Sequence, residues 1–108
     1  MDDVTFHQRA DTCLEELFEA LNRASEKHEL EADMNAGALT VEFEEPKAKF
    51  VVSPNSPVRQ IWVSANVRSY KLDWQDAAAA FVLPSTGQTL KQLLAEAAGQ
   101  HLGEEIEL

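Results

Sequence analysis

The spacing of the apolar residues changes twice along this chain, and this constrains the possible folds more than any other feature. From Asp3 to Ser25 apolar residues recur every three or four positions, which is the stripe of an amphipathic helix. From Leu30 to about residue 83 they alternate with polar residues, as in strands with one buried face. Spacings of three and four return from residue 88 to His101. The sequence therefore predicts a helix, a run of strands and a second helix.

Turn signals divide the alternating region into five or six strands. NAG at 35–37, Glu45-Pro46 and SPNSP at 53–57 separate the first four, and 81–83 would be a short edge strand ended by Pro84. Lys47 and Lys49 would face Glu42 and Glu44 across a hairpin. Ser85 and Gln88 have capping-box spacing before the second helix. We predict an α+β fold, a two-layer α-β sandwich with both helices on one face of an antiparallel sheet of five or six strands.

Length and charge limit the classes of protein and of partner that are possible. The 108 residues suit one domain, spanning residues 1–108. No segment has the roughly 20 apolar residues of a membrane span, and the acidic N-terminal residues lack a signal-peptide pattern. We therefore expect a cytoplasmic protein. The net charge of −10 disfavours nucleic acid and anionic membranes as partners. The single cysteine, Cys13, falls on the core face of the first helix, where it would be an inert apolar residue.

Acidic residues are concentrated at the start of the chain, where residues 1–45 carry 13 acidic and three basic side chains. A set of seven continues from the solvent face of the first helix into the first strand: Asp11, Glu15, Glu19, Glu26, Glu29, Glu31 and Asp33. Carboxylates in such a row suit hard cations, including iron, but no known metal motif accompanies them. His7, one turn before Asp11, could add a nitrogen ligand. A purely solubilising surface is the alternative interpretation.

A second candidate surface lies on the sheet face that the helices leave open. Trp62 and Gln60 alternate with the aliphatic residues of their strand, so they are expected on this open face. Arg68 and Lys71, on the next strand, would adjoin them. Exposed tryptophans are enriched at binding hot spots, which makes Gln60, Trp62 and Arg68 candidate partner-binding residues. Coverage of Trp62 by a loop is the alternative. The sequence contains no nucleophile with its base and no phosphate-binding loop.

Five segments together resemble the frataxin family, in particular its bacterial members. They are FHQRAD at 6–11, Glu15-Glu16, NAGALTVEFE from 35, PVRQIWVS at 57–64 and GQTLKQLLAEAA at 87–98. The resemblance spans nearly the whole chain. It implies an iron-binding protein that regulates or assists iron-sulfur cluster assembly by docking on the cysteine desulfurase and its scaffold, as iron sensor, donor or modulator.

The same resemblance implies the residues involved. An acidic ridge would bind iron weakly and contact a basic patch of the desulfurase; it maps to Glu15, Glu16, Glu19, Glu26, Glu29, Glu31 and Asp33. Gln60 and Trp62 match the residues of the family's sheet face. We expect a monomer, with oligomerisation on iron left open. Two other functions stay open: an enzyme that oxidises and stores iron, and an acidic interaction module without a metal.

Overall fold

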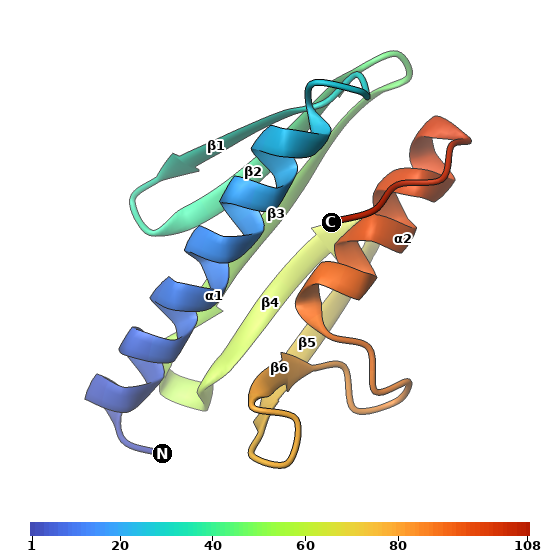
Figure 1. Ribbon diagram of the computed structural model, residues 1–108. Helices are drawn as coiled ribbons and strands as arrows, with labels where there is room; N and C mark the ends of the chain where they lie inside the picture. Colours follow the sequence, from blue (N-terminus) through green and yellow to red (C-terminus); the bar gives the residue numbers. More distant parts are fainter.

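The computed structural model describes residues 1–108, and its elements follow the expected order (Figure 1). The helices and strands are α1 (Asp3–Ala24), β1 (Glu31–Asn35), β2 (Ala38–Glu44), β3 (Lys47–Asn55), the 3-10 helix η1 (Ser56–Val58), β4 (Gln60–Ala65), β5 (Arg68–Gln75), β6 (Ala80–Val82) and α2 (Leu90–Leu102). The six strands form one antiparallel sheet in sequential order. The predicted α+β sandwich is confirmed.

Both helices lie side by side on one face of the sheet (Figure 1). α1 packs against β1, β2 and β3, while α2 covers the half of the sheet that contains β4 to β6. Between the layers lies one connected cluster of 23 buried residues, including Phe6, Leu17, Phe50 and Leu94. No helix combines the length and the apolar character needed to cross a bilayer. The opposite face of the sheet carries no helix and stays open.

The helix ends are fixed by specific caps. At the start of α1 the Thr5 backbone N–H donates to Asp2 Oδ1 at 2.7 Å. α2 begins at Leu90, because Thr89 and Gln92 form a reciprocal capping box there. The predicted capping pair of Ser85 and Gln88 is therefore wrong. Those residues belong to a loop in which Thr86 and Gln88 bond to each other.

The strand register decides which residues share the open face. Glu42 pairs with Lys49 and Glu44 with Lys47, as predicted. On its other side Glu42 lies opposite Glu31, a like-charge pair that the sequence pattern did not indicate. Like charges directly opposite each other destabilise a strand pair. The first two strands are therefore the acidic side of the sheet, and β3 begins with two lysines.

The C-terminal residues run back between the two helices (Figure 1). Gly103 ends α2 with a φ of 68°, which is the left-handed conformation that glycine adopts freely. Ile106 is only 7% exposed and joins the core cluster. Glu104 accepts a 3.1 Å bond from His28 Nδ1 or forms an ion pair with it, linking the tail to the end of α1. The tail is thus part of the fold.

Candidate functional site

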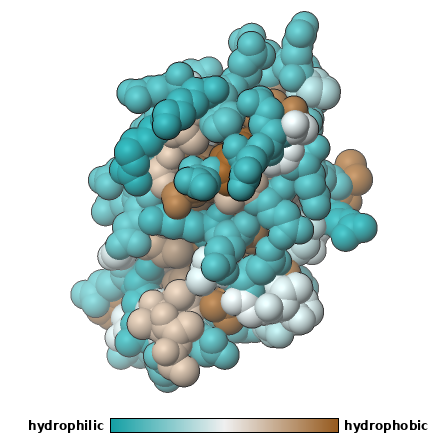
Figure 2. Space-filling model, turned by 45° about the vertical axis from the view of Figure 1, so that its right-hand side comes forward, coloured by the Kyte–Doolittle hydropathy of each residue, from teal (hydrophilic) through white to brown (hydrophobic).

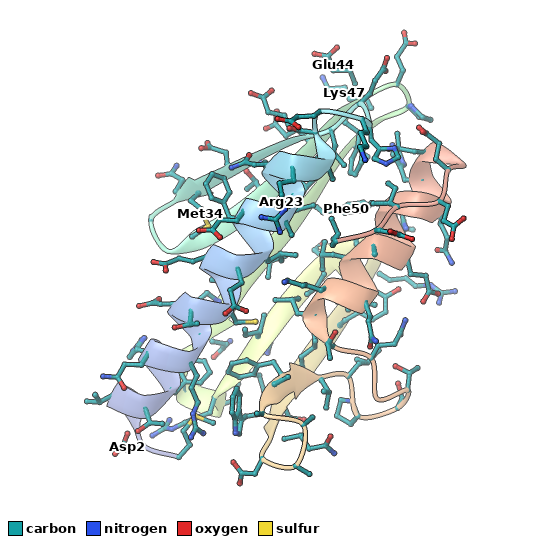
Figure 3. The ribbon with its side chains drawn as sticks, in the orientation of Figure 1. Asp2, Arg23, Met34, Glu44, Lys47 and Phe50 are labelled. Atoms are coloured by element: carbon teal, nitrogen blue, oxygen red, sulfur yellow. The ribbon has the colours of Figure 1, made fainter.

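The acidic ridge occupies the outer side of α1 and the edge strand β1. We define it as the seven carboxylates Asp11, Glu15, Glu19, Glu26, Glu29, Glu31 and Asp33, all of which are exposed. β1 alternates between exposed acids and half-buried Ala32 and Met34 that pack on the core. Figure 3 shows red carboxylate tips projecting outward along α1 and the adjoining β1–β2 edge, with Met34 labelled beside α1. Helix and strand therefore contribute to one acidic border of the molecule.

The ridge carboxylates have no basic partners. The three ion pairs of the structure are Arg9–Asp76, His28–Glu104 and Arg59–Asp3, and none includes a ridge residue. Within α1, Asp11, Glu15 and Glu19 follow one another at intervals of four. Each such like-charge pair destabilises a helix by roughly 0.2–0.5 kcal/mol. The folded chain thus holds an uncompensated negative surface that a cation or a basic protein would neutralise.

Two further residues were predicted with this set, and one of them, Glu16, lies elsewhere. Glu16 is on the opposite flank of α1, where it lines a groove with Cys13, Trp74 and Phe81. His7 is at the N-terminal end of α1, and its Nε2 lies 3.2 Å from Ser56 Oγ of η1. The helical period explains the position of Glu16, which is turned by about 100° from Glu15. His7 precedes Asp11 by four residues and so lies beside it on the same stripe of α1, as predicted, whereas Glu16 does not join that stripe.

A second group of carboxylates extends the ridge at the corner after α1. Glu42 and Glu44 of β2 line a groove together with Glu29 and Glu31. Sequence reasoning missed this extension, since it assigned Glu42 and Glu44 only to pairs with lysines. The register of β1 against β2 would have indicated it. Nowhere, however, do three His, Cys, Asp or Glu side chains converge closely enough to hold a metal ion.

Trp62 lies on the open face, as predicted, and is held by an ordered polar chain. It is 38% exposed. Its indole Nε1 donates to Gln60 Oε1 at 3.0 Å, and Gln60 Nε2 donates to Asp73 Oδ1 at 3.0 Å. The Lys71 ammonium lies 5.0 Å from the ring centroid, at the distance of a cation–π contact. These bonds fix a large aromatic surface, which lowers the entropy lost on binding a partner.

Arg68 does not adjoin Trp62, and its predicted position is wrong. Trp62 pairs with Lys71, whereas Arg68 pairs with the buried Ala65 at the other end of β5. Because side chains alternate along a strand, Arg68 shares the helix-facing side with Tyr70 and Leu72. The aromatic patch on the open face therefore consists of Gln60, Trp62, Lys71 and Asp73.

The single thiol is unsuited to nucleophilic chemistry. Cys13 is partly buried against the core, and this desolvation raises its pKa to about 11. The Glu16 carboxylate adds to the increase, while Lys91 opposes it. At neutral pH the group is a protonated thiol, which is the unreactive form.

The fold, the acidic ridge and the aromatic patch together define a class of protein: a small α-β sandwich with an unpaired acidic border and an ordered tryptophan on its open sheet face.

Comparison with known proteins identifies the family within this class. The frataxin-like domain profile matches residues 1–104, and the chain therefore belongs to the frataxin-like family. A relative from Azotobacter vinelandii, named iron-sulfur cluster assembly protein CyaY, is 28% identical over 109 residues. That alignment covers 99% of this chain and 94% of the relative. The resemblance inferred from the sequence segments is confirmed.

Solved structures show the same fold. Frataxin from Psychromonas ingrahamii superposes with a TM-score of 0.85 at 21% identity, covering 99% of this chain and 97% of that one. Yeast frataxin gives a TM-score of 0.71 at 22% identity, over 92% of this chain and 81% of that one. At these identities the likeness concerns the arrangement of helices and strands. The order of two helices and six strands is therefore shared despite wide divergence in sequence.

Proposed function

We propose that this protein binds iron weakly at its acidic ridge and regulates or assists iron-sulfur cluster assembly by docking on the cysteine desulfurase and its scaffold. Family membership and the printed name of the Azotobacter relative support a place in that pathway. The observation that carries the proposal is the set of seven exposed ridge carboxylates without an ion-pair partner. Iron is here a ligand or cargo held at a surface.

Carboxylate repulsion provides the driving force for both parts of this function. Hard oxygen ligands suit Fe²⁺, and a bound cation removes repulsion that the folded chain otherwise retains. Because no three ligands converge, an ion would keep most of its water shell and exchange readily. A basic surface on a partner would gain from the same relief. Cation and partner would therefore compete for the ridge or occupy it together.

Docking also has an aromatic anchor on the open face of the sheet. Glu31, Asp33 and Trp62 alternate with core-facing residues of their strands, so all three project from the open face. Ser53 and Lys71 flank Trp62 on the neighbouring strands. A partner that covers this face would meet carboxylates at β1 and an aromatic anchor at β4. Two anchors of different chemistry fix the orientation of a complex as well as its affinity.

Iron binding is tested by titrating the protein with Fe²⁺ without oxygen while recording amide NMR spectra. Line broadening and shifts should concentrate at residues 11–33 and the adjoining part of β2. A Glu19→Gln/Glu31→Gln variant should weaken the effect, whereas Glu105→Gln/Glu107→Gln, with the same charge change in the tail, should not. Perturbations scattered over the molecule would contradict a ridge site.

Docking is tested by measuring affinity for a purified cysteine desulfurase at several salt concentrations. Glu19→Lys/Glu31→Lys should lower affinity at least tenfold and flatten its salt dependence, while Glu105→Lys/Glu107→Lys is the matched control. Trp62→Ala should weaken binding to the scaffold-containing complex with little effect on salt dependence. Equal affinities for all variants would refute the proposed interface.

The same materials separate this proposal from its rivals. An iron-oxidising enzyme would consume oxygen in proportion to turnover when Fe²⁺ is added in air. An interaction module without a metal role would bind the desulfurase through the ridge but show no Fe²⁺ effect beyond that of equal ionic strength. Weak Fe²⁺ binding without turnover, combined with docking, is the expected result.

A further inference from the structure

The edge of the sheet beside β6 is only partly covered. β6 pairs with Asp73, Trp74 and Gln75, so residues 68–72 of β5 have β4 as their only neighbouring strand. Continuing this register would place Pro84 opposite Lys71, and proline has no N–H to donate. The chain turns away there through the loop of residues 83–88. The first half of β5 is therefore an open strand edge.

The hairpin geometry shows which backbone groups this edge presents. Asn66 and Val67 have φ values of 51° and 58°, the signature of a two-residue type I′ turn. Ala65 and Arg68 then form the closing hydrogen-bonded pair, and bonding directions alternate along β5. Ser69 and Lys71 consequently direct their N–H and C=O groups away from β4. The edge offers two donors and two acceptors to a further strand.

A groove of about 500 Å³ runs beside these groups. On the helix side it is lined by Tyr70, Leu83 and Leu93, which supply an apolar wall. Arg68 and Lys71 contribute two positive charges to its rim in a chain whose net charge is −10. Glu96, the one acid in the lining, is already bonded to Gln88 and Gln100. Lys71 lies on the open side of the sheet, whereas Arg68 lies on the helix side next to the turn. The groove is thus complementary to an extended segment whose apolar residues face the helix side and whose acidic residues face Lys71, with one more acidic residue near Arg68.

The turn next to this edge carries an unusual residue. Val67 is fully exposed and, although β-branched, adopts a positive φ. For most residues with a Cβ atom, this conformation costs roughly 1–2 kcal/mol; asparagine tolerates it better, and glycine adopts it freely. Burial of Val67 does not offset this cost; the turn is held by its neighbour Asn66, whose Nδ2 donates to the Ala97 carbonyl at 3.1 Å. An apolar side chain held outward beside the open edge adds area that a bound segment can cover.

We propose that the edge of β5 binds an extended acidic segment of a partner protein as an additional strand of the sheet. The backbone of that segment would pair with Ser69 and Lys71, as in other cases of strand addition. Its apolar residues would contact Tyr70, Leu83 and Leu93 on the helix side. Its acidic residues would lie near Lys71 on the open side and, at the end next to the turn, near Arg68. This site is separate from the acidic ridge and shares only Lys71 with the aromatic patch, so its test does not depend on iron binding at the ridge.

The probe is a soluble acetylated octapeptide of alternating aspartate and valine, titrated into the full-length protein to millimolar concentration. At saturation, hydrogen exchange at the Ser69 and Lys71 amides should slow at least tenfold. A peptide of alternating lysine and valine, and an acidic peptide interrupted by prolines, should produce no slowing. No slowing with the acidic peptide, or slowing confined to other strands, would overturn the proposal.

Two variants test the edge directly. Ser69→Pro removes one outward donor and should lower affinity for the acidic peptide at least tenfold. If this variant does not fold, Arg68→Glu decides: it should also weaken binding, while Lys27→Glu, with the same charge change on another surface, should not. Unchanged binding of Arg68→Glu would contradict the proposal. So would protection of Ser69 and Lys71 that grows with protein concentration alone and coincides with dimers in sedimentation, because the edge would then pair with a second copy.

Discussion

Replacing Gly99 by alanine should destabilise the protein even though alanine is the better helix former. Gly99 lies inside α2, where Gly→Ala normally stabilises by up to about 1 kcal/mol. Here a Cβ would lie 2.8 Å from the backbone oxygen of Glu104, which is much closer than van der Waals contact allows. The Gly103 and Glu104 N–H groups also bond to the Gly99 carbonyl. The tail must therefore move to admit a methyl group.

The magnitude follows from what the tail buries. Displacing it exposes Ile106, which is 7% exposed in the folded chain, and full burial of such a side chain contributes about 1.5–3 kcal/mol. Subtracting the gain in helix propensity of about 1 kcal/mol leaves a net loss of about 0.5–2 kcal/mol. In a domain of about 100 residues, each kcal/mol of lost stability lowers the melting temperature by roughly 4–8 °C.

Urea unfolding of four proteins tests this reasoning: the wild type, Gly99→Ala, Ile106→Ala and the double variant. Once Ile106 is truncated, the tail contributes little, so Gly99→Ala should become neutral or stabilising in that background. The two substitutions would then show a coupling free energy of about 0.5–3 kcal/mol. Equal destabilisation by Gly99→Ala in both backgrounds, or stabilisation of the wild type, would refute the proposed steric conflict.

Three further predictions concern charge and titration. Because its pKa is raised from 9.0 to about 11, the Cys13 thiol should react with a disulfide reagent about 100-fold more slowly at pH 8 in the native than in the unfolded chain; comparable rates would contradict its burial. The Thr5 backbone N–H lowers the pKa of Asp2 below 3.8, so the stabilisation it gives is present above that value and lost as pH falls through the folded pKa. The difference in unfolding free energy between the wild type and Asp2→Asn should therefore decrease as the pH falls below 3.8, and a constant difference would exclude this capping charge. Glu31→Gln should stabilise the fold by about 0.2–1 kcal/mol at low salt by relieving repulsion with Glu42, with Glu105→Gln as the control; an unchanged gain in high salt would show that the effect is not electrostatic.

Each of these tests probes a different physical effect. Gly99 probes packing of the tail, Cys13 probes desolvation, and Asp2 and Glu31 probe charge at a helix end and at a strand edge. Figure 2 shows why charge dominates outside the core: the visible surface is mostly hydrophilic, with apolar residues gathered in small separate patches. Function on such a surface depends on which charges and patches are neighbours.

Many features of the fold could be predicted because they depend on residues near one another in the chain. Helical spacing sets the buried face of α1, and alternation sets the inward residues of β2 and β4. The position of Trp62 beside Gln60 follows from the same alternation. The spacing could not decide where α2 begins, because Ser85–Gln88 and Thr89–Gln92 both fit a capping box. In the folded chain, Thr89 and Gln92 form it.

The candidate sites were predicted less completely, because they join residues from different elements. Helical spacing sets Glu16 apart from the acidic row, and only the family resemblance included it. Spacing could not show that Ser56 contacts His7. The neighbour of Trp62 depended on the β4–β5 register, which selected Lys71 rather than Arg68. In Figure 3, Asp2 and the Glu44–Lys47 hairpin lie at opposite ends of the molecule. Acidic residues of the first 45 positions therefore lie in different surroundings, although they are close in the sequence.

The sequence by itself therefore determined the types of element, their order, the composition of the core and the acidic character of the first 45 residues. These properties follow from side-chain periodicity and charge, which are local. Only the tertiary structure decided that Glu42 stands beside Glu31, that a tail carbonyl excludes a side chain at Gly99, and that half of β5 has no partner. Such properties depend on register and on the contact of distant segments, and their physical cause is the three-dimensional packing of the whole chain.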